Sequence, residues 1–79
     1  KSAEQGYGPA QMDLGVAYYS GKGIVADSVT AYAWFHLAAQ QGVTNAQKNK
    51  ATVYSRLLPE DRRRAVDLAT EFSRKYSNR

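Results

Sequence analysis

The stretch AQMDLGVAYYSGKGIVADSVTAYAWFHLAA, residues 10–39, decides the fold of this chain. Its apolar residues recur at helical spacing on both sides of a turn that contains Gly21 and Gly23. Asp27, which follows the turn, is a good N-cap residue. The run after Asp27 is apolar nearly all round, so we expect it to be covered on several sides. The stretch therefore predicts two packed helices joined by a loop.

Part of this pattern recurs along the chain. Residues 3–6, AEQG, return as residues 39–42, AQQG, and Tyr18 has its counterpart in Tyr54, each shifted by 36 residues. A fixed period of this length is typical of helical repeat arrays, in which neighbouring units share a continuous core. Because residues 39–42 should end a helix, we expect residues 1–5 to be the last turn of an earlier hairpin. The chain is thus interpreted as a piece of a longer array.

The second half of the chain predicts two further helices. Thr44 or Asn45 can cap a third helix that runs to about Leu57, and Pro59 can open a fourth. We expect Tyr54 to be buried on the third helix, like its counterpart on the first. The fourth helix has one apolar and one charged face, which suits a capping helix at the end of an array.

These segments predict an all-α fold, an antiparallel helix-hairpin solenoid of about two repeats and four helices. Residues 1–79 would form a single solenoid fragment. Residues 3–42 are the well-matched repeat, and residues 43–79 are a degenerate C-terminal repeat that ends in the capping helix.

The composition excludes several classes of protein. The 79 residues contain no Cys, which rules out disulfides and Cys-based zinc sites. No apolar run approaches the roughly 18 residues of a membrane span. His36 is the single histidine and has no acidic residue three or four positions away, so a general base is not indicated. Glu60 and Asp61 stand at a helix start, where the macrodipole explains them. We therefore predict no enzyme, cofactor or metal site.

The best-matched segment resembles a known family, the Sel1-like repeat (SLR), a relative of the tetratricopeptide repeat with a longer hairpin loop. Ile24 stands where the family pattern has Val, and Thr30 stands where it often has Lys. The residues that carry the resemblance are Ala10, Leu14, Gly15, Tyr18, Gly21, Gly23, Asp27, Ala31, Trp34 and Ala38. In the second half, Lys50-Ala51 replaces the Leu-Gly pair, as in a degenerate last repeat.

Packing roles follow from the side chains of this pattern. We expect Leu14 and Tyr18 to fill the space between the two helices of the first hairpin. Gly15 and Ala31 are small, which predicts close approach of the two backbones. Trp34 is the largest apolar anchor.

The resemblance implies a non-catalytic protein–protein interaction scaffold whose partner is a protein or peptide held in the helical groove. Tetratricopeptide architecture implies that first helices line this groove, here through Met12, Val16, Tyr19, Lys48, Thr52 and Ser55. An equally weighted interpretation has Met12 and Val16 packing against a preceding repeat, whose absence would open an N-terminal face to self-association. The resemblance leaves the bacterial periplasm, the envelope and the cytoplasm open as locations.

A second hypothesis comes from the formal charge of +4. Basic residues gather in the last quarter of the chain: Arg62, Arg63, Arg64, Arg74, Lys75 and Arg79. Such a helix could bind nucleic acid or an anionic surface electrostatically, although interspersed carboxylates favour a solvated face. A third hypothesis is a regulatory appendage of an enzyme.

Overall fold

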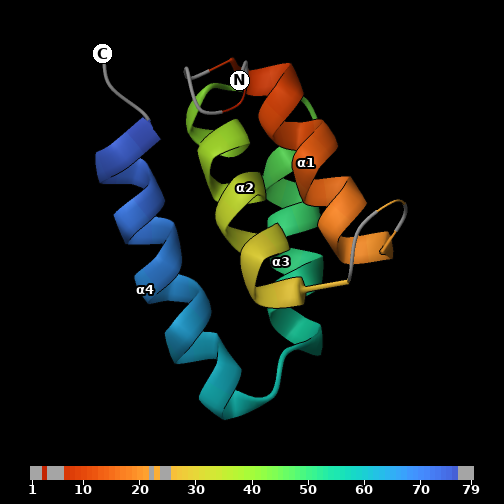
Figure 1. Ribbon diagram of the computed structural model, residues 1–79, viewed down its shortest axis with the longest axis vertical. Coiled ribbons are helices and arrows are strands. Elements are labelled where there is room, and N and C mark those ends of the chain that lie inside the picture. Colours follow the sequence, from red (N-terminus) through yellow and green to blue (C-terminus); the bar gives the residue numbers. More distant parts are fainter. Residues whose placement is uncertain (1–2, 4–6, 22, 24–25, 77–79) are drawn as a thin grey trace.

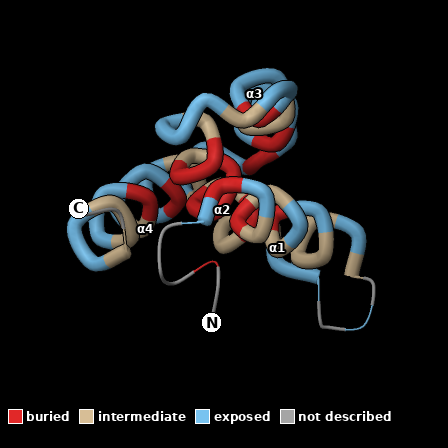
Figure 2. Tube along the Cα trace, turned by 90° about the horizontal axis from the view of Figure 1, so that it is seen from above, coloured by how far each residue is buried: buried red, intermediate tan, exposed pale blue. Residues whose placement is uncertain are grey.

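Four helices build the structure, a computed structural model that describes residues 3, 7–21, 23 and 26–76. They are α1 (Gly8–Ser20), α2 (Ser28–Gln40), α3 (Ala46–Arg56) and α4 (Pro59–Tyr76) (Figure 1). The described residues contain no strand, so the predicted all-α class is confirmed. Helix α2 packs against each of the other three, and the view from above shows α1, α3 and α4 arranged around it (Figure 2).

Two segments on which the sequence analysis made predictions are only partly described by the structure. Of the segment expected to end an earlier hairpin, Ala3 alone is described, and it is buried against Trp34 and Leu37. Lys22 and Ile24 of the glycine-containing loop also lie outside it. The loop's two glycines are described, and both have positive φ, 76° at Gly21 and 81° at Gly23.

Local hydrogen bonds explain where α2 begins and ends. Asp27 caps the helix as predicted, since its carboxylate accepts from the Thr30 backbone N–H at 3.1 Å and from the Thr30 hydroxyl at 2.7 Å. At the other end Gly42 has a φ of 78°. The N–H groups of Gly42 and Val43 donate to the carbonyls of Ala39 and Ala38, which is the Schellman arrangement.

The starts of α3 and α4 differ from each other in how they are stabilised. Asn45 is the N-cap of α3 in a left-handed conformation, φ 72°, and its side chain makes no capping hydrogen bond. Helix α4 opens with Pro59 and carries Glu60 and Asp61 in its first turn. A proline at the first position and carboxylates near the positive end of the macrodipole both favour a helix start.

The core lies on both sides of α2. On one side, Ala31 and Phe35 pack with Val53, Leu57 and Ala65 from α3, the α3–α4 turn and α4. On the other side, the residues around Trp34 and Leu37 are Ala3, Ala10, Leu14, Tyr18, Phe72 and Tyr76. Leu14 and Tyr18 therefore pack between the helices of the first hairpin as expected.

Trp34 is the central anchor of the second cluster. It is 5% exposed, and its ring centroid lies 4.7 Å from that of Phe72 and 5.4 Å from that of Tyr76. Offset and tilted aromatic pairs at these distances stabilise a core beyond their buried area. Trp34 thus packs α4 against α2, together with the buried Ala65 of the first cluster.

The expected burial of Tyr54 is wrong. Tyr54 is 38% exposed, whereas the preceding residue Val53 is 1% exposed. One residue turns a helix by about 100°, so the inward position of Val53 places Tyr54 outside the core. There its ring lies 5.7 Å from the ring of Tyr32 and 5.0 Å from the guanidinium of Arg62.

The role of Gly15 also differs from the expectation. A β-carbon at Gly15 would meet the Phe35 ring, 2.5 Å from Cδ1 and from Cε1. Gly15 therefore makes room for an aromatic side chain of α2 rather than for its backbone. Ala31, one turn before Phe35, is completely buried.

Candidate functional site: the groove between α1 and α3

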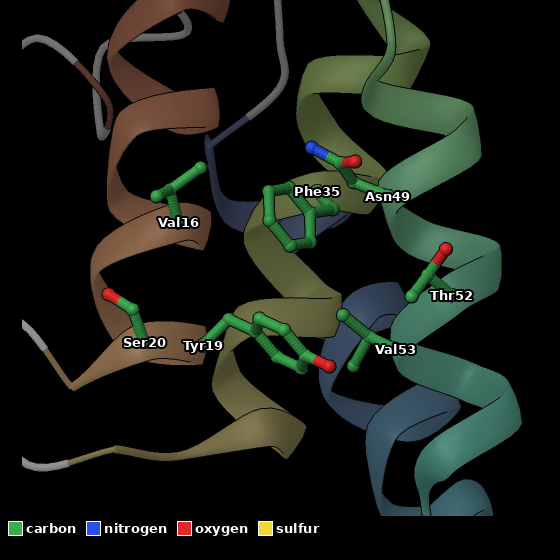
Figure 3. A pocket seen from close by; sticks show the side chains of 7 residues that line it. All are labelled: Val16, Tyr19, Ser20, Phe35, Asn49, Thr52 and Val53. Carbon is green, nitrogen blue, oxygen red and sulfur yellow. The ribbon is translucent and has the colours of Figure 1, made fainter.

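Helices α1 and α3 form the walls of an open pocket, and α2 supplies its floor (Figure 3). The pocket has a volume of about 130 Å³. Its lining residues are Val16, Tyr19, Ser20, Phe35, Asn49, Thr52 and Val53. The site thus combines side chains of three helices, two of them in the first hairpin and one in the next.

The pocket has an apolar floor and one exposed apolar wall. Phe35 and Val53 belong to the core and are 2% and 1% exposed. Val16 is 46% exposed and forms part of the wall beside this apolar floor. Phe35 reaches this position because Gly15 leaves space for its ring. The small residue on α1 therefore shapes the site as well as the core.

Two side-chain contacts cross the groove from α3 to α1. Near one end, the Asn49 amide donates to the Met12 sulfur at 3.9 Å, a weak hydrogen bond. Near the other end, the Arg56 guanidinium donates to the Tyr19 hydroxyl at 2.9 Å. These contacts define the length of the apolar opening between them.

The residues expected to line the groove are distributed unevenly around it. Val16, Tyr19 and Thr52 line the pocket itself. Met12 lies at one end through its contact with Asn49. The side chains of Lys48 and Ser55 are exposed on α3 and do not line the pocket, and the Ser55 hydroxyl donates to the Thr52 carbonyl at 2.8 Å.

Sequence reasoning missed Ser20, Phe35, Asn49 and Val53. A signal for part of this set was present in α3, where Asn49, Thr52, Val53 and Arg56 follow the i, i+3, i+4, i+7 spacing of one helix face. No comparable signal marked Phe35. An apolar residue of a middle helix is indistinguishable from ordinary core until the neighbouring helices are placed.

A second cluster lies between α2 and α3. The Lys50 ammonium is 3.3 Å from His36 Nδ1 and 5.9 Å from the centroid of the Tyr32 ring. Burial, and secondarily the charge of Lys50, lowers the pKa of His36. Burial also raises the pKa of Tyr32, with Tyr54 adding to the effect. Helices α2 and α3 contain no Asp or Glu that could orient His36 as a general base.

The arginines at the start of α4 make contacts within the chain. Arg62 donates to the backbone carbonyls of Tyr54 and Ser55 at 3.1 and 3.3 Å. Arg63 and Arg64 form ion pairs within α4, with Asp67 at 3.5 Å and with Asp61 at 3.1 Å. This end of the helix therefore carries its positive charge next to matching carboxylates and carbonyls.

The part of the chain that the structure describes lacks two further kinds of feature. It contains no cluster of three or more His, Cys, Asp or Glu side chains able to hold a metal ion. None of its helices has the length and apolar character needed to cross a bilayer.

Comparison with known proteins identifies the repeat. The family model of the Sel1 repeat matches residues 8–43, the hairpin formed by α1 and α2. Residues 8–43 therefore carry a Sel1 repeat. The search of curated proteins returned no match for this chain.

One similar solved structure extends the likeness beyond the matched hairpin. It is a crystal structure of a protective antigen present in uropathogenic Escherichia coli strains that displays an SLR fold. The two share 33% sequence identity with a TM-score of 0.89 over 95% of this chain. The present chain spans 16% of the length of that antigen. Helices α3 and α4 therefore also adopt positions found in an SLR protein.

Proposed function

We propose that this chain is a protein-interaction scaffold that binds a segment of a partner protein in the groove between α1 and α3. Sel1 repeats are generally protein–protein interaction scaffolds, and they are typically non-catalytic. The groove lies between the first helices of two successive hairpins. A segment bound there would contact both hairpins at once.

The observation that carries the proposal is the open apolar pocket of about 130 Å³ between these helices. Binding energy at protein interfaces is concentrated where a few apolar or aromatic side chains are desolvated in a pocket with a polar rim. Here Val16 and Phe35 supply apolar surface, and Tyr19 and Asn49 supply polar groups at the rim. These are the features of a site that anchors one side chain of a partner.

The electrostatic alternative has less support in the structure. Arg62, Arg63 and Arg64 contact carbonyls or carboxylates of the chain itself. A nucleic acid that bound these arginines would have to displace their contacts within the chain. The groove is therefore the favoured site.

The test is a capture experiment with the intact protein, read by mass spectrometry. The groove variant combines Val16→Asp with Tyr19→Ala, and the control Val66→Asp alters a 41% exposed valine on α4. Circular dichroism verifies that both variants fold. We expect the control to retain the partners of the unaltered protein and the groove variant to lose them. Partners retained by both variants would reject the groove as the binding site. That result is expected if Val16 instead packs against a preceding repeat.

A further inference from the structure

The charges around the groove have one prevailing sign. Helix α3 contains Lys48, Lys50 and Arg56 and has no Asp or Glu. Lys50 contacts His36 on the far side of α3, whereas Arg56 crosses the groove to the neutral hydroxyl of Tyr19. Lys48 and Arg56 have no carboxylate within ion-pair distance among the described residues. Asp13 is the single carboxylate of α1.

Lys48 and Arg56 lie on either side of Thr52 along α3. Lys48, Thr52 and Arg56 follow one another at i, i+4 and i+8, so they share one face of α3. Thr52 lines the pocket. With a rise of 1.5 Å per residue, the α-carbons of Lys48 and Arg56 each lie about 6 Å along the helix axis from that of Thr52.

The pocket between these cations is large enough for one side chain. Its volume of about 130 Å³ is close to that of an apolar cavity, about 150 Å³, that accommodates benzene. A leucine side chain, or a phenyl ring that displaces Tyr19 slightly, is of this size. Asn49 and Thr52 at the wall can hydrogen-bond the backbone of the segment that carries it.

We propose that the groove selects an extended acidic segment of the form acidic–x–apolar–x–acidic, a specificity that rests on the proposed function of the groove. In an extended chain, residues i, i+2 and i+4 point to the same side and are about 6.6 Å apart per step. The apolar residue then enters the pocket while the two carboxylates reach Lys48 and Arg56. The pattern is symmetric, so it satisfies both cations in either chain direction.

The test is an NMR titration of the isotope-labelled chain with short blocked peptides. The acidic probe contains Glu-Ser-Leu-Ser-Glu, and the matched neutral probe contains Gln-Ser-Leu-Ser-Gln. A third probe, Ser-Glu-Leu-Glu-Ser, keeps the charge but points the carboxylates away from the leucine side. We expect the acidic probe to shift the amide signals of Val16 and Thr52 and to bind more tightly than the other two. Each exposed ion pair should contribute about two- to five-fold in affinity at low salt.

Variants of the protein locate this charge dependence. Lys48→Gln should weaken the acidic probe by about two- to five-fold and leave the neutral probe unchanged. Arg56→Gln also removes the hydrogen bond to Tyr19, so its effect is measured relative to the neutral probe, and it should weaken the acidic probe by about two- to five-fold more than the neutral one. Arg74→Gln removes an exposed cation from α4 and serves as the control with the same change in charge. We expect this control to bind the acidic probe as the unaltered chain does.

The possible failures are distinguishable. Equal affinity for the acidic and neutral probes, with shifts in the groove, would overturn the acidic specificity and leave the proposed function standing. Absence of binding by the acidic probe would also overturn it. Concentration-dependent shifts of Val16 and Thr52 without any peptide would assign the groove to a second copy of the chain instead. Partner capture that survives the groove variant would reject the proposed function itself.

Discussion

Gly15 of α1 and Phe35 of α2 fit so closely that a β-carbon on the glycine would lie 2.5 Å from two atoms of the phenyl ring. Phe35 belongs to the core and is 2% exposed, and its ring also lines the floor of the groove. One contact between the helices of the Sel1 hairpin thus determines both the packing of the core and the shape of the candidate site.

Gly15→Ala should therefore destabilise the protein, although alanine is the better helix former. The gain in helix propensity is about 1 kcal/mol, and forcing a buried ring to move costs about 1–3 kcal/mol. We expect a net loss of roughly 1 kcal/mol in the free energy of unfolding, measured by urea denaturation. Asp13→Ala, on the exposed side of α1, is the control and should change stability little. A Gly15→Ala protein more stable than the original would show that Phe35 does not restrict this position.

Trp34→Ala should be the most damaging single truncation. It removes the ring that packs against Phe72 and Tyr76, so it also weakens the packing of α4 on α2. Deleting a large buried aromatic costs about 3–5 kcal/mol, a large share of the stability of a domain this small. Thermal unfolding followed by circular dichroism measures the loss. Tyr7→Ala truncates an aromatic that is 59% exposed and should have little effect. Similar losses in both variants would contradict the role given to Trp34.

The stability of the α2–α3 packing should decrease in mild acid. His36 has a pKa below the ordinary value of 6.5 because of burial and the charge of Lys50. Below pH 6.5 the unfolded chain therefore binds a proton at this site before the folded chain does. The stabilising contribution is complete above pH 6.5 and decreases as the pH falls toward the lower native pKa.

The variant His36→Gln tests whether His36 causes this pH dependence. The free energy of unfolding is measured between pH 7.5 and about pH 5. Lys50 and Tyr32 are the titratable groups that face the imidazole. The slope between pH 6.5 and the native pKa should be smaller in the variant. An unchanged slope would place the pH dependence at other groups.

Binding to nucleic acid should be weak and should vanish near physiological salt. Three arginines of α4 already contact carbonyls or carboxylates, so few phosphate contacts remain to release counterions. Fluorescence anisotropy with labelled single- and double-stranded DNA across salt concentrations measures this. Micromolar affinity at about 0.15 M salt with a slope indicating five or more phosphate contacts would instead support the electrostatic hypothesis.

The elements of the fold could be predicted from local sequence because local chemistry determines them. Asp27 could be recognised as a cap and Gly42 as a helix terminator from the residue types alone, and both have those roles. Trp34 could be recognised as a core anchor because it lies in an apolar run. Such features depend on neighbours within a few positions of the chain.

The site could be predicted less completely because it depends on how helices are rotated against each other. The sequence predicts burial of both Val53, as an apolar residue, and Tyr54, from the repeat period, but packing of α3 buries only the valine. The same rotation brings Asn49 to the pocket and leaves the side chain of Lys48 exposed outside the pocket lining. The 36-residue period identifies which segments of the chain correspond. It does not determine which of two adjacent residues on a helix faces the core.

The central claim, that a partner occupies the groove between α1 and α3, is tested most directly by site-specific photo-crosslinking in cells that express the intact protein. A photoreactive amino acid is placed at Thr52, which lines the groove, or at Thr70, which is exposed on α4. We predict a crosslinked partner from position 52 that is missing from position 70 and is lost when Val16→Asp is added. Crosslinks from position 70 with none from position 52 would contradict the account.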